Sequence, residues 1–139
     1  MKILHVMLRV ADLDQSLSFF VDLLHFKVVR RIDNAGGRFS LIYLVNRLNP
    51  GLEIELTFNW DVSSYTIGSS FGHIALAVDD LYSICQRCLD MGFVLARPPR
   101  DGFIAFIKSP DGISFELLQN GPSLPPQEPW RSMANVGTW

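Results

Sequence analysis

The sequence predicts an α+β protein made of two copies of one module, each with the order strand, helix and three strands. The first observation is an internal repeat, because residues 5–13 and residues 73–81 agree at five of nine positions. A second match, between residues 51–56 and 112–117, agrees at glycine, glutamate and leucine. Residues 3–10 and 52–59 also place their polar side chains on one face and aliphatic side chains on the other, which is typical of strands with one buried face. Such repetition indicates duplicated structural units.

The first module is predicted over residues 1–60 and begins with a strand at residues 3–10. Asp12 and Gln15 form a capping pair in front of apolar side chains that recur at helical spacing, so a helix follows the strand. His25 is expected to end this helix, since histidine tolerates a positive φ. The remaining strands are expected at residues 27–32, 39–45 and 52–59.

The second module repeats this order over residues 72–119, after a connector at residues 61–71. Asp80 is the expected N-cap of its helix, and Gly92 is a helix-ending glycine. Its strands are expected at residues 72–78, 93–96, 103–108 and 113–119.

Residues 120–139 form a C-terminal tail with four prolines and two tryptophans. The prolines exclude regular structure over most of the tail. Tryptophans are costly to leave in water, so we expect an extended segment that docks on the protein or on a partner chain. Disorder is the alternative interpretation.

Composition limits the class of function. The net charge of −2, from 14 acidic and 12 basic residues, argues against binding to nucleic acid or to a membrane surface. No apolar run approaches the roughly 20 residues of a membrane helix, and no signal peptide is recognisable. With Cys85 and Cys88 as the only cysteines, the predicted location is the cytoplasm. Both cysteines lie on the apolar stripe of the second helix, which favours core packing over a redox role.

The repeat provides four candidate metal ligands. His5 and His73 occupy equivalent places on the first strands of the modules, and Glu55 and Glu116 occupy equivalent places on the last strands. Two imidazoles and two carboxylates around one centre suit an octahedral divalent ion with room for two waters. The alternative is that each of the four is an ordinary polar residue at a strand surface.

Two further polar residues share the faces of these ligands. Arg9 lies on the face of His5, and Asn59 lies on the face of Glu55. An arginine on such a face is costly unless it meets an anion, so we expect anion recognition, with a structural salt bridge as the alternative.

Four segments resemble glyoxalase I, lactoylglutathione lyase, of the vicinal-oxygen-chelate superfamily (glyoxalase/bleomycin-resistance-like fold). They are residues 5–10 (HVMLRV), 55–60 (ELTFNW), 71–75 (FGHIA) and 111–118 (DGISFELL). The resemblance implies paired βαβββ modules and a homodimer with sites at the subunit interface. It implies that the hemithioacetal of methylglyoxal and glutathione is isomerised to S-D-lactoylglutathione, a detoxification of methylglyoxal.

The resemblance also implies roles for residues. His5 and Glu55 of one chain and His73 and Glu116 of the other would bind the metal. A histidine as first ligand in a short chain resembles the nickel- or cobalt-activated class, with zinc also possible. The remaining implied substrate contacts are Arg9 and Asn59 for the glutathione carboxylate, and Arg100 in place of a lysine common in the family.

The chemistry requires a base beside a weak carbon acid. A divalent ion stabilises the enediolate charge, and a carboxylate moves the proton between neighbouring carbons. We expect Glu116 to be this base and Glu55 to be its pseudo-symmetric counterpart. The alternatives are another metal enzyme on the same modules, such as a dioxygenase or a thiol transferase, or a non-catalytic binding module. The fourth ligand, Glu55, argues against the first, and the complete ligand set argues against the second.

Overall fold

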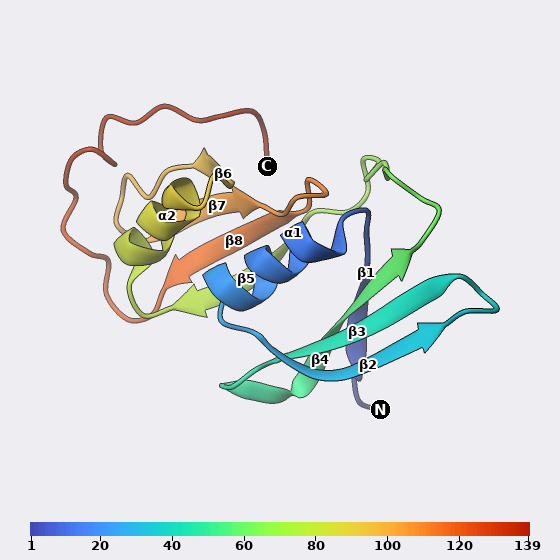
Figure 1. Ribbon diagram of the computed structural model, residues 1–139. Coiled ribbons are helices and arrows are strands. Elements are labelled where there is room, and N and C mark those ends of the chain that lie inside the picture. The colour runs from blue at the N-terminus through green and yellow to red at the C-terminus, as the bar shows by residue number, and fades with distance from the viewer. The chain divides into compact units, whose positions relative to one another are not determined.

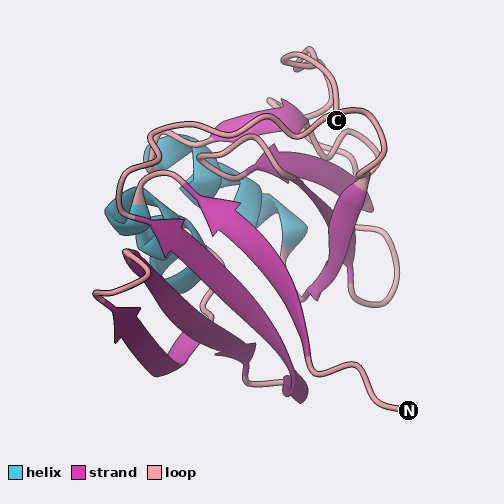
Figure 2. Ribbon diagram, turned by 90° about the vertical axis from the view of Figure 1, so that its right-hand side faces the viewer, coloured by secondary structure: helices cyan, strands magenta, loops and turns pink.

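The computed structural model describes residues 1–139 and separates into two compact units, residues 1–66 and residues 67–139. Each unit contains one four-stranded sheet, in the order β1-β4-β3-β2 in the first unit and β5-β8-β7-β6 in the second (Figure 1). In each sheet the first strand pairs in parallel with the last, and the other pairs are antiparallel (strands are magenta in Figure 2). The two sheets therefore have the same topology.

The first unit contains six elements, which follow the predicted order. They are β1 (His5–Val10), α1 (Leu13–Leu17), η1 (Ser18–Leu23), β2 (Lys27–Asn34), β3 (Phe39–Asn46) and β4 (Asn49–Asn59). The carboxylate of Asp12 accepts a hydrogen bond of 2.9 Å from the backbone N–H of Gln15, which confirms the predicted cap. His25 has a φ of 58° and follows the last helical turn, also as predicted.

The helix of the first unit differs from the prediction in one respect. It is an α-helix only up to Leu17 and continues as a π-helix, η1. The adjacent Phe19 and Phe20 are both buried, together with Leu23. A π-helix has a wider turn than an α-helix, which accommodates two neighbouring large rings on the buried side. Apolar spacing alone does not reveal this change of pitch.

The second unit contains five elements. They are β5 (His73–Val78), α2 (Leu81–Asp90), β6 (Val94–Arg97), β7 (Ile104–Lys108) and β8 (Ser114–Gln119). The carboxylate of Asp80 caps α2 by accepting a hydrogen bond of 3.0 Å from the backbone N–H of Ser83. The helix packs on β6, β7 and β8 and buries Cys85 and Cys88. Burial raises the pKa of the Cys88 thiol to about 12, so this cysteine is a core residue and not a reactive thiol.

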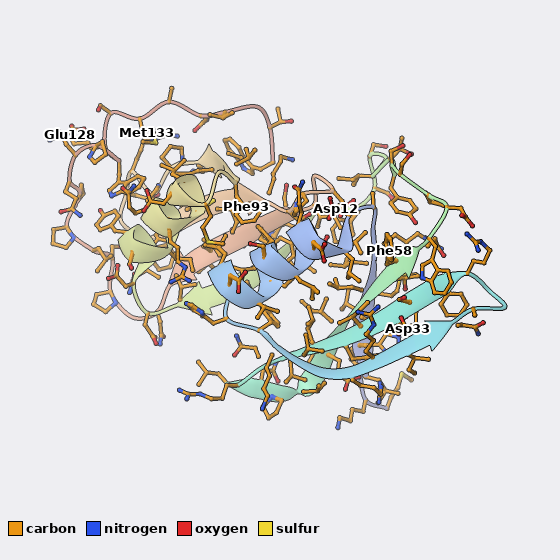
Figure 3. The ribbon with its side chains drawn as sticks, in the orientation of Figure 1. Asp12, Asp33, Phe58, Phe93, Glu128 and Met133 are labelled. Atoms are coloured by element: carbon orange, nitrogen blue, oxygen red, sulfur yellow. The ribbon has the colours of Figure 1, made fainter.

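The C-terminal tail docks on the second unit, as one of the two interpretations predicted. It has no helix or strand and runs past α2 and β6 (red in Figure 1; Glu128 and Met133 mark its course in Figure 3). Trp130 is 3% exposed and stacks on Tyr82 of α2, with ring centroids 6.1 Å apart. The hydroxyl of Tyr82 donates a hydrogen bond of 2.9 Å to the carbonyl of Pro125.

Candidate metal centre and substrate site

The first candidate half-site lies on the β1–β4 pair. The register places His5 opposite Glu53, and Glu55 is two residues further along β4. Side chains two apart in a strand share a face, so His5 and Glu55 are diagonal neighbours. Their Nε2 and Oε2 atoms are 3.3 Å apart. Glu55 is 9% exposed, whereas the imidazole of His5 is open to solvent.

The second candidate half-site repeats this geometry on the β5–β8 pair. His73 lies opposite Ser114, and Glu116 is again two residues further along the last strand. The Nε2 atom of His73 and the Oε2 atom of Glu116 are 3.2 Å apart. The internal repeat of the sequence therefore corresponds to the same diagonal pair in both units.

Each pair fits the donor set of a divalent metal. Neighbouring ligands are roughly 3.0 Å apart in an octahedron and roughly 3.4 Å apart in a tetrahedron, for metal–ligand bonds of about 2.1 Å. The two His–Glu separations, 3.3 and 3.2 Å, lie in this range. No group of three or more His, Cys, Asp or Glu side chains forms a potential metal site in the structure. Each unit by itself thus offers one imidazole nitrogen and one carboxylate oxygen.

Polar groups surround the first pair. The hydroxyl of Thr57 donates a hydrogen bond of 3.3 Å to Glu55, and Tyr43 is the cross-strand neighbour of Glu55. Burial, followed by a hydrogen bond with Glu55, raises the pKa of the Tyr43 hydroxyl. The guanidinium of Arg30 lies 3.7 Å from the centre of the Tyr43 ring. The Tyr43 ring also meets the imidazole of His5 edge to face, with centroids 6.1 Å apart.

Apolar groups occupy the same places beside the second pair. Phe106 is the cross-strand neighbour of Glu116, in the position that Tyr43 has beside Glu55. The Phe106 ring meets the imidazole of His73 edge to face, with centroids 5.3 Å apart. The ring of Trp139, in the tail, stacks on Phe106 at 5.5 Å and 24°. The two candidate half-sites therefore share a His–Glu pair and differ in the side chains around it.

The other predicted site residues lie in different environments. Arg9 is exposed on the His5 face, and it is absent from the ion pairs of the structure. The amide of Asn59 donates a hydrogen bond of 2.8 Å to the hydroxyl of Tyr65. The guanidinium of Arg100 donates hydrogen bonds of 2.8 Å to the carbonyl of Met133 and to the side chain of Asn135. Arg100 is therefore tied to the tail.

Sequence reasoning missed the aromatic neighbours of the ligands. Tyr43 and Phe106 correspond in strand register, since they lie opposite Glu55 and Glu116. They precede these glutamates by 12 and 10 residues, so the sequence repeat did not align them. Arg30 corresponds to Arg97 in register, but a strand pattern does not show that its guanidinium covers the Tyr43 ring. Trp139 lies in the tail, which has no counterpart in the first module.

Comparisons with known proteins agree with this architecture. The model of the Glyoxalase/Bleomycin resistance protein/Dioxygenase superfamily matches residues 2–117. The probable lactoylglutathione lyase of Synechocystis sp. is 42% identical over 125 residues, which cover 86% of this chain and 95% of that protein. The lactoylglutathione lyase of Haemophilus influenzae is 40% identical over 126 residues, with 86% and 93% covered.

Solved structures of glyoxalase I are also similar to this chain. The trypanothione-dependent glyoxalase I of Leishmania major is similar with a TM-score of 0.78 and 33% identity, and the match covers 86% of each chain. Glyoxalase I of Zea mays is similar with a TM-score of 0.78 and 32% identity, over 87% of this chain and 45% of that one.

The chain belongs to the Glyoxalase/Bleomycin resistance protein/Dioxygenase superfamily. Within that superfamily, the matches to lactoylglutathione lyases over most of the chain confirm the predicted resemblance to glyoxalase I. The predicted α+β fold of two repeated modules is confirmed as well. None of the helices has the length and apolar character needed to cross a membrane.

Proposed function

We propose that this chain is a metal-dependent lactoylglutathione lyase that isomerises the hemithioacetal of methylglyoxal and glutathione to S-D-lactoylglutathione. The relatives named lactoylglutathione lyase support this function. The observation that carries it is the pair of matching His–Glu contacts, His5 with Glu55 and His73 with Glu116, at 3.3 and 3.2 Å. Two imidazoles and two carboxylates form a complete set of protein ligands for a divalent ion.

In this proposal the metal is nickel or cobalt in preference to zinc. The four ligands are His5, Glu55, His73 and Glu116. When bound, the ion supplies the positive charge that stabilises an enediolate form of the substrate. The donor atoms, two nitrogens and two oxygens, suit an ion that accepts six ligands and leaves two positions for substrate oxygens.

Glu116 is the proposed base. It takes the proton from C1 of the hemithioacetal and returns it to C2, so the hydroxyl and carbonyl carbons exchange roles and no redox cofactor is needed. The surroundings of the two glutamates support this choice. Glu55 accepts a hydrogen bond from Thr57 and lies beside the hydroxyl of Tyr43. Such contacts hold a carboxylate in one orientation, which suits a metal ligand. Glu116 lies opposite Phe106, whose ring has no hydroxyl to donate. In this proposal Glu116 therefore moves the proton and Glu55 acts mainly as a ligand.

A homodimer completes the site in this proposal. His5 and Glu55 of one chain would meet His73 and Glu116 of a second copy. The support is that each unit by itself provides two ligands. Strand β2 is also exposed along its whole length and carries apolar side chains, including Val28, Val29 and Ile32, that a second copy could cover. We propose the cytoplasm as the location, since Cys85 and Cys88 are both unpaired.

The substrate contacts are proposed for Arg9, Asn59 and Arg100. Arg9 is exposed on the His5 face without a carboxylate partner, which suits recognition of a glutathione carboxylate. Arg100 binds the tail, but a guanidinium has five N–H groups, so donors remain for a substrate anion.

An ultraviolet assay of thioester formation tests the proposal. The metal is stripped with a chelator, and nickel, cobalt or zinc is added in turn with glutathione and methylglyoxal. We expect no turnover without metal and the highest turnover with nickel or cobalt. Zinc as the best activator would reject the metal assignment. Turnover that needs a different thiol, tested with trypanothione as the comparison, would reject glutathione as the carrier.

A further inference from the structure

The C-terminal tail is attached to the second unit by specific contacts. It lies beyond residues 2–117, the region that the superfamily model matches. The backbone N–H of Leu124 donates to the carbonyl of Gly102 at 2.9 Å, and the N–H of Val136 donates to the carbonyl of Ala96 at 2.9 Å. Together with the contacts of Arg100, these bonds fix the tail on both sides of the buried Trp130.

Gly102 shows how closely the tail approaches the body. Its φ is +67°, and a Cβ atom built there would lie 2.0 Å from the carbonyl oxygen of Leu124. Real Cβ atoms do not come so close to a backbone oxygen, so glycine is required at this contact. The tail is thus packed closely against the unit at Leu124.

Trp139 of the tail lies beside the second half-site. Trp139 stacks on Phe106, and Phe106 meets His73 edge to face and lies opposite Glu116. Phe106 is only 5% exposed, whereas Trp139 is 45% exposed. Trp139 therefore helps to shield Phe106 from water and still presents aromatic surface of its own. In the first unit, the ring of Tyr43 is covered by the guanidinium of Arg30 and not by a second aromatic ring.

We propose that Trp139, from the tail, determines specificity by forming with Phe106 an aromatic wall for the side group of the 2-oxoaldehyde. This inference rests on the proposed function. The reacting carbons lie next to the proposed base, Glu116, and the side group is one bond away from them. A methyl group is too short to cover the wall, whereas a phenyl group can stack on it. The enzyme should therefore favour aryl over methyl substrates.

The test compares two substrates with matched variants. Nickel-loaded wild-type protein, W139A, W139F and V136A are assayed with the glutathione adducts of phenylglyoxal and methylglyoxal. We expect W139A to lower kcat/KM for the phenyl adduct about tenfold and for the methyl adduct less than about twofold. W139F should restore most of the loss. V136A is the control, because it removes an exposed side chain of the same tail and keeps the backbone bond to Ala96.

The possible outcomes separate this inference from the proposed function. An equal loss on both adducts, or no loss on either, would overturn the aromatic wall. If wild-type protein isomerises neither adduct, the proposed function is wrong, and the wall is tested by calorimetric binding of S-benzylglutathione and S-methylglutathione. W139A should then raise Kd for the benzyl thioether about tenfold and leave the methyl thioether nearly unchanged. Equal effects, or no binding of either thioether, would overturn it.

Discussion

The two candidate half-sites are built on equivalent strand pairs, β1–β4 and β5–β8, yet the side chains next to their His–Glu pairs differ in character. Beside His5 and Glu55 stand the hydroxyl of Tyr43 and the guanidinium of Arg30. Beside the second pair, Phe106 takes the place of Tyr43, and the ring of Trp139 from the tail stacks on it. The duplicated modules thus share the His–Glu pair and differ in the side chains around it. Under the proposed function, this difference supports Glu55 as a ligand and Glu116 as the base.

The sharpest test of this comparison replaces each glutamate by glutamine. The amide keeps one ligating oxygen but cannot accept a proton at neutral pH. We expect E116Q to lower turnover by about 10²-fold or more, the scale of lost general-base catalysis, and E55Q to lower it much less. Turnover and metal content are measured on the same preparation. An E116Q protein that keeps its metal and near wild-type turnover would make Glu55 the leading candidate base.

A second test exchanges the aromatic neighbours. F106Y brings a hydroxyl towards Glu116, where it would stabilise the carboxylate and weaken the base, so we expect turnover to fall by about tenfold. Y43F removes the hydroxyl from the Glu55 side and should change turnover by less than about threefold. Steady-state kinetics with nickel-loaded protein provides the measurement. Equal effects of the two variants would mean that the half-sites are functionally equivalent.

A third test asks whether the first unit also binds the remote part of the substrate. R9A should raise KM for the glutathione adduct by about tenfold and change kcat by less than about twofold. The reason is that Arg9 would bind the substrate and the transition state equally well. R47A is the control, since Arg47 is also exposed but lies in the turn between β3 and β4. A large fall in kcat with an unchanged KM would instead indicate that Arg9 takes part in the chemical step.

The smallest expected effect concerns stability at high pH. Burial and then the hydrogen bond with Glu55 raise the pKa of Tyr43 above its ordinary value of 10. The folded state therefore holds this proton more tightly than the unfolded state. The resulting stabilisation is fully present below pH 10 and is lost as the pH rises through the folded pKa. Urea unfolding above pH 10 should show a steeper loss for wild type than for Y43F.

The sequence predicted those features that depend on local pattern or on repetition. Strand alternation and the caps at Asp12 and Asp80 fixed the element order, and strand ends were accurate to within three residues. The four candidate ligands could be found because duplication placed them at corresponding positions. The π-helix η1 was missed because apolar spacing does not distinguish its pitch from that of an α-helix. The contact of Trp139 with Phe106 was missed because Trp139 lies in a proline-rich tail whose sequence has no periodicity from which its position could be predicted.

The bond from the tail to Ala96 has a consequence for solubility. β6 is an edge strand, and Ala96 lies at an irregularity in its pairing with β7. An open edge offers unpaired backbone groups to other chains, and proteins protect such edges with charges or with covering segments. In the first unit, the edge strand β2 carries three charged side chains, Lys27, Arg30 and Arg31. In the second unit, the N–H of Val136 donates a hydrogen bond to the carbonyl of Ala96 in β6. Removing the tail would therefore expose a strand edge through which copies could aggregate.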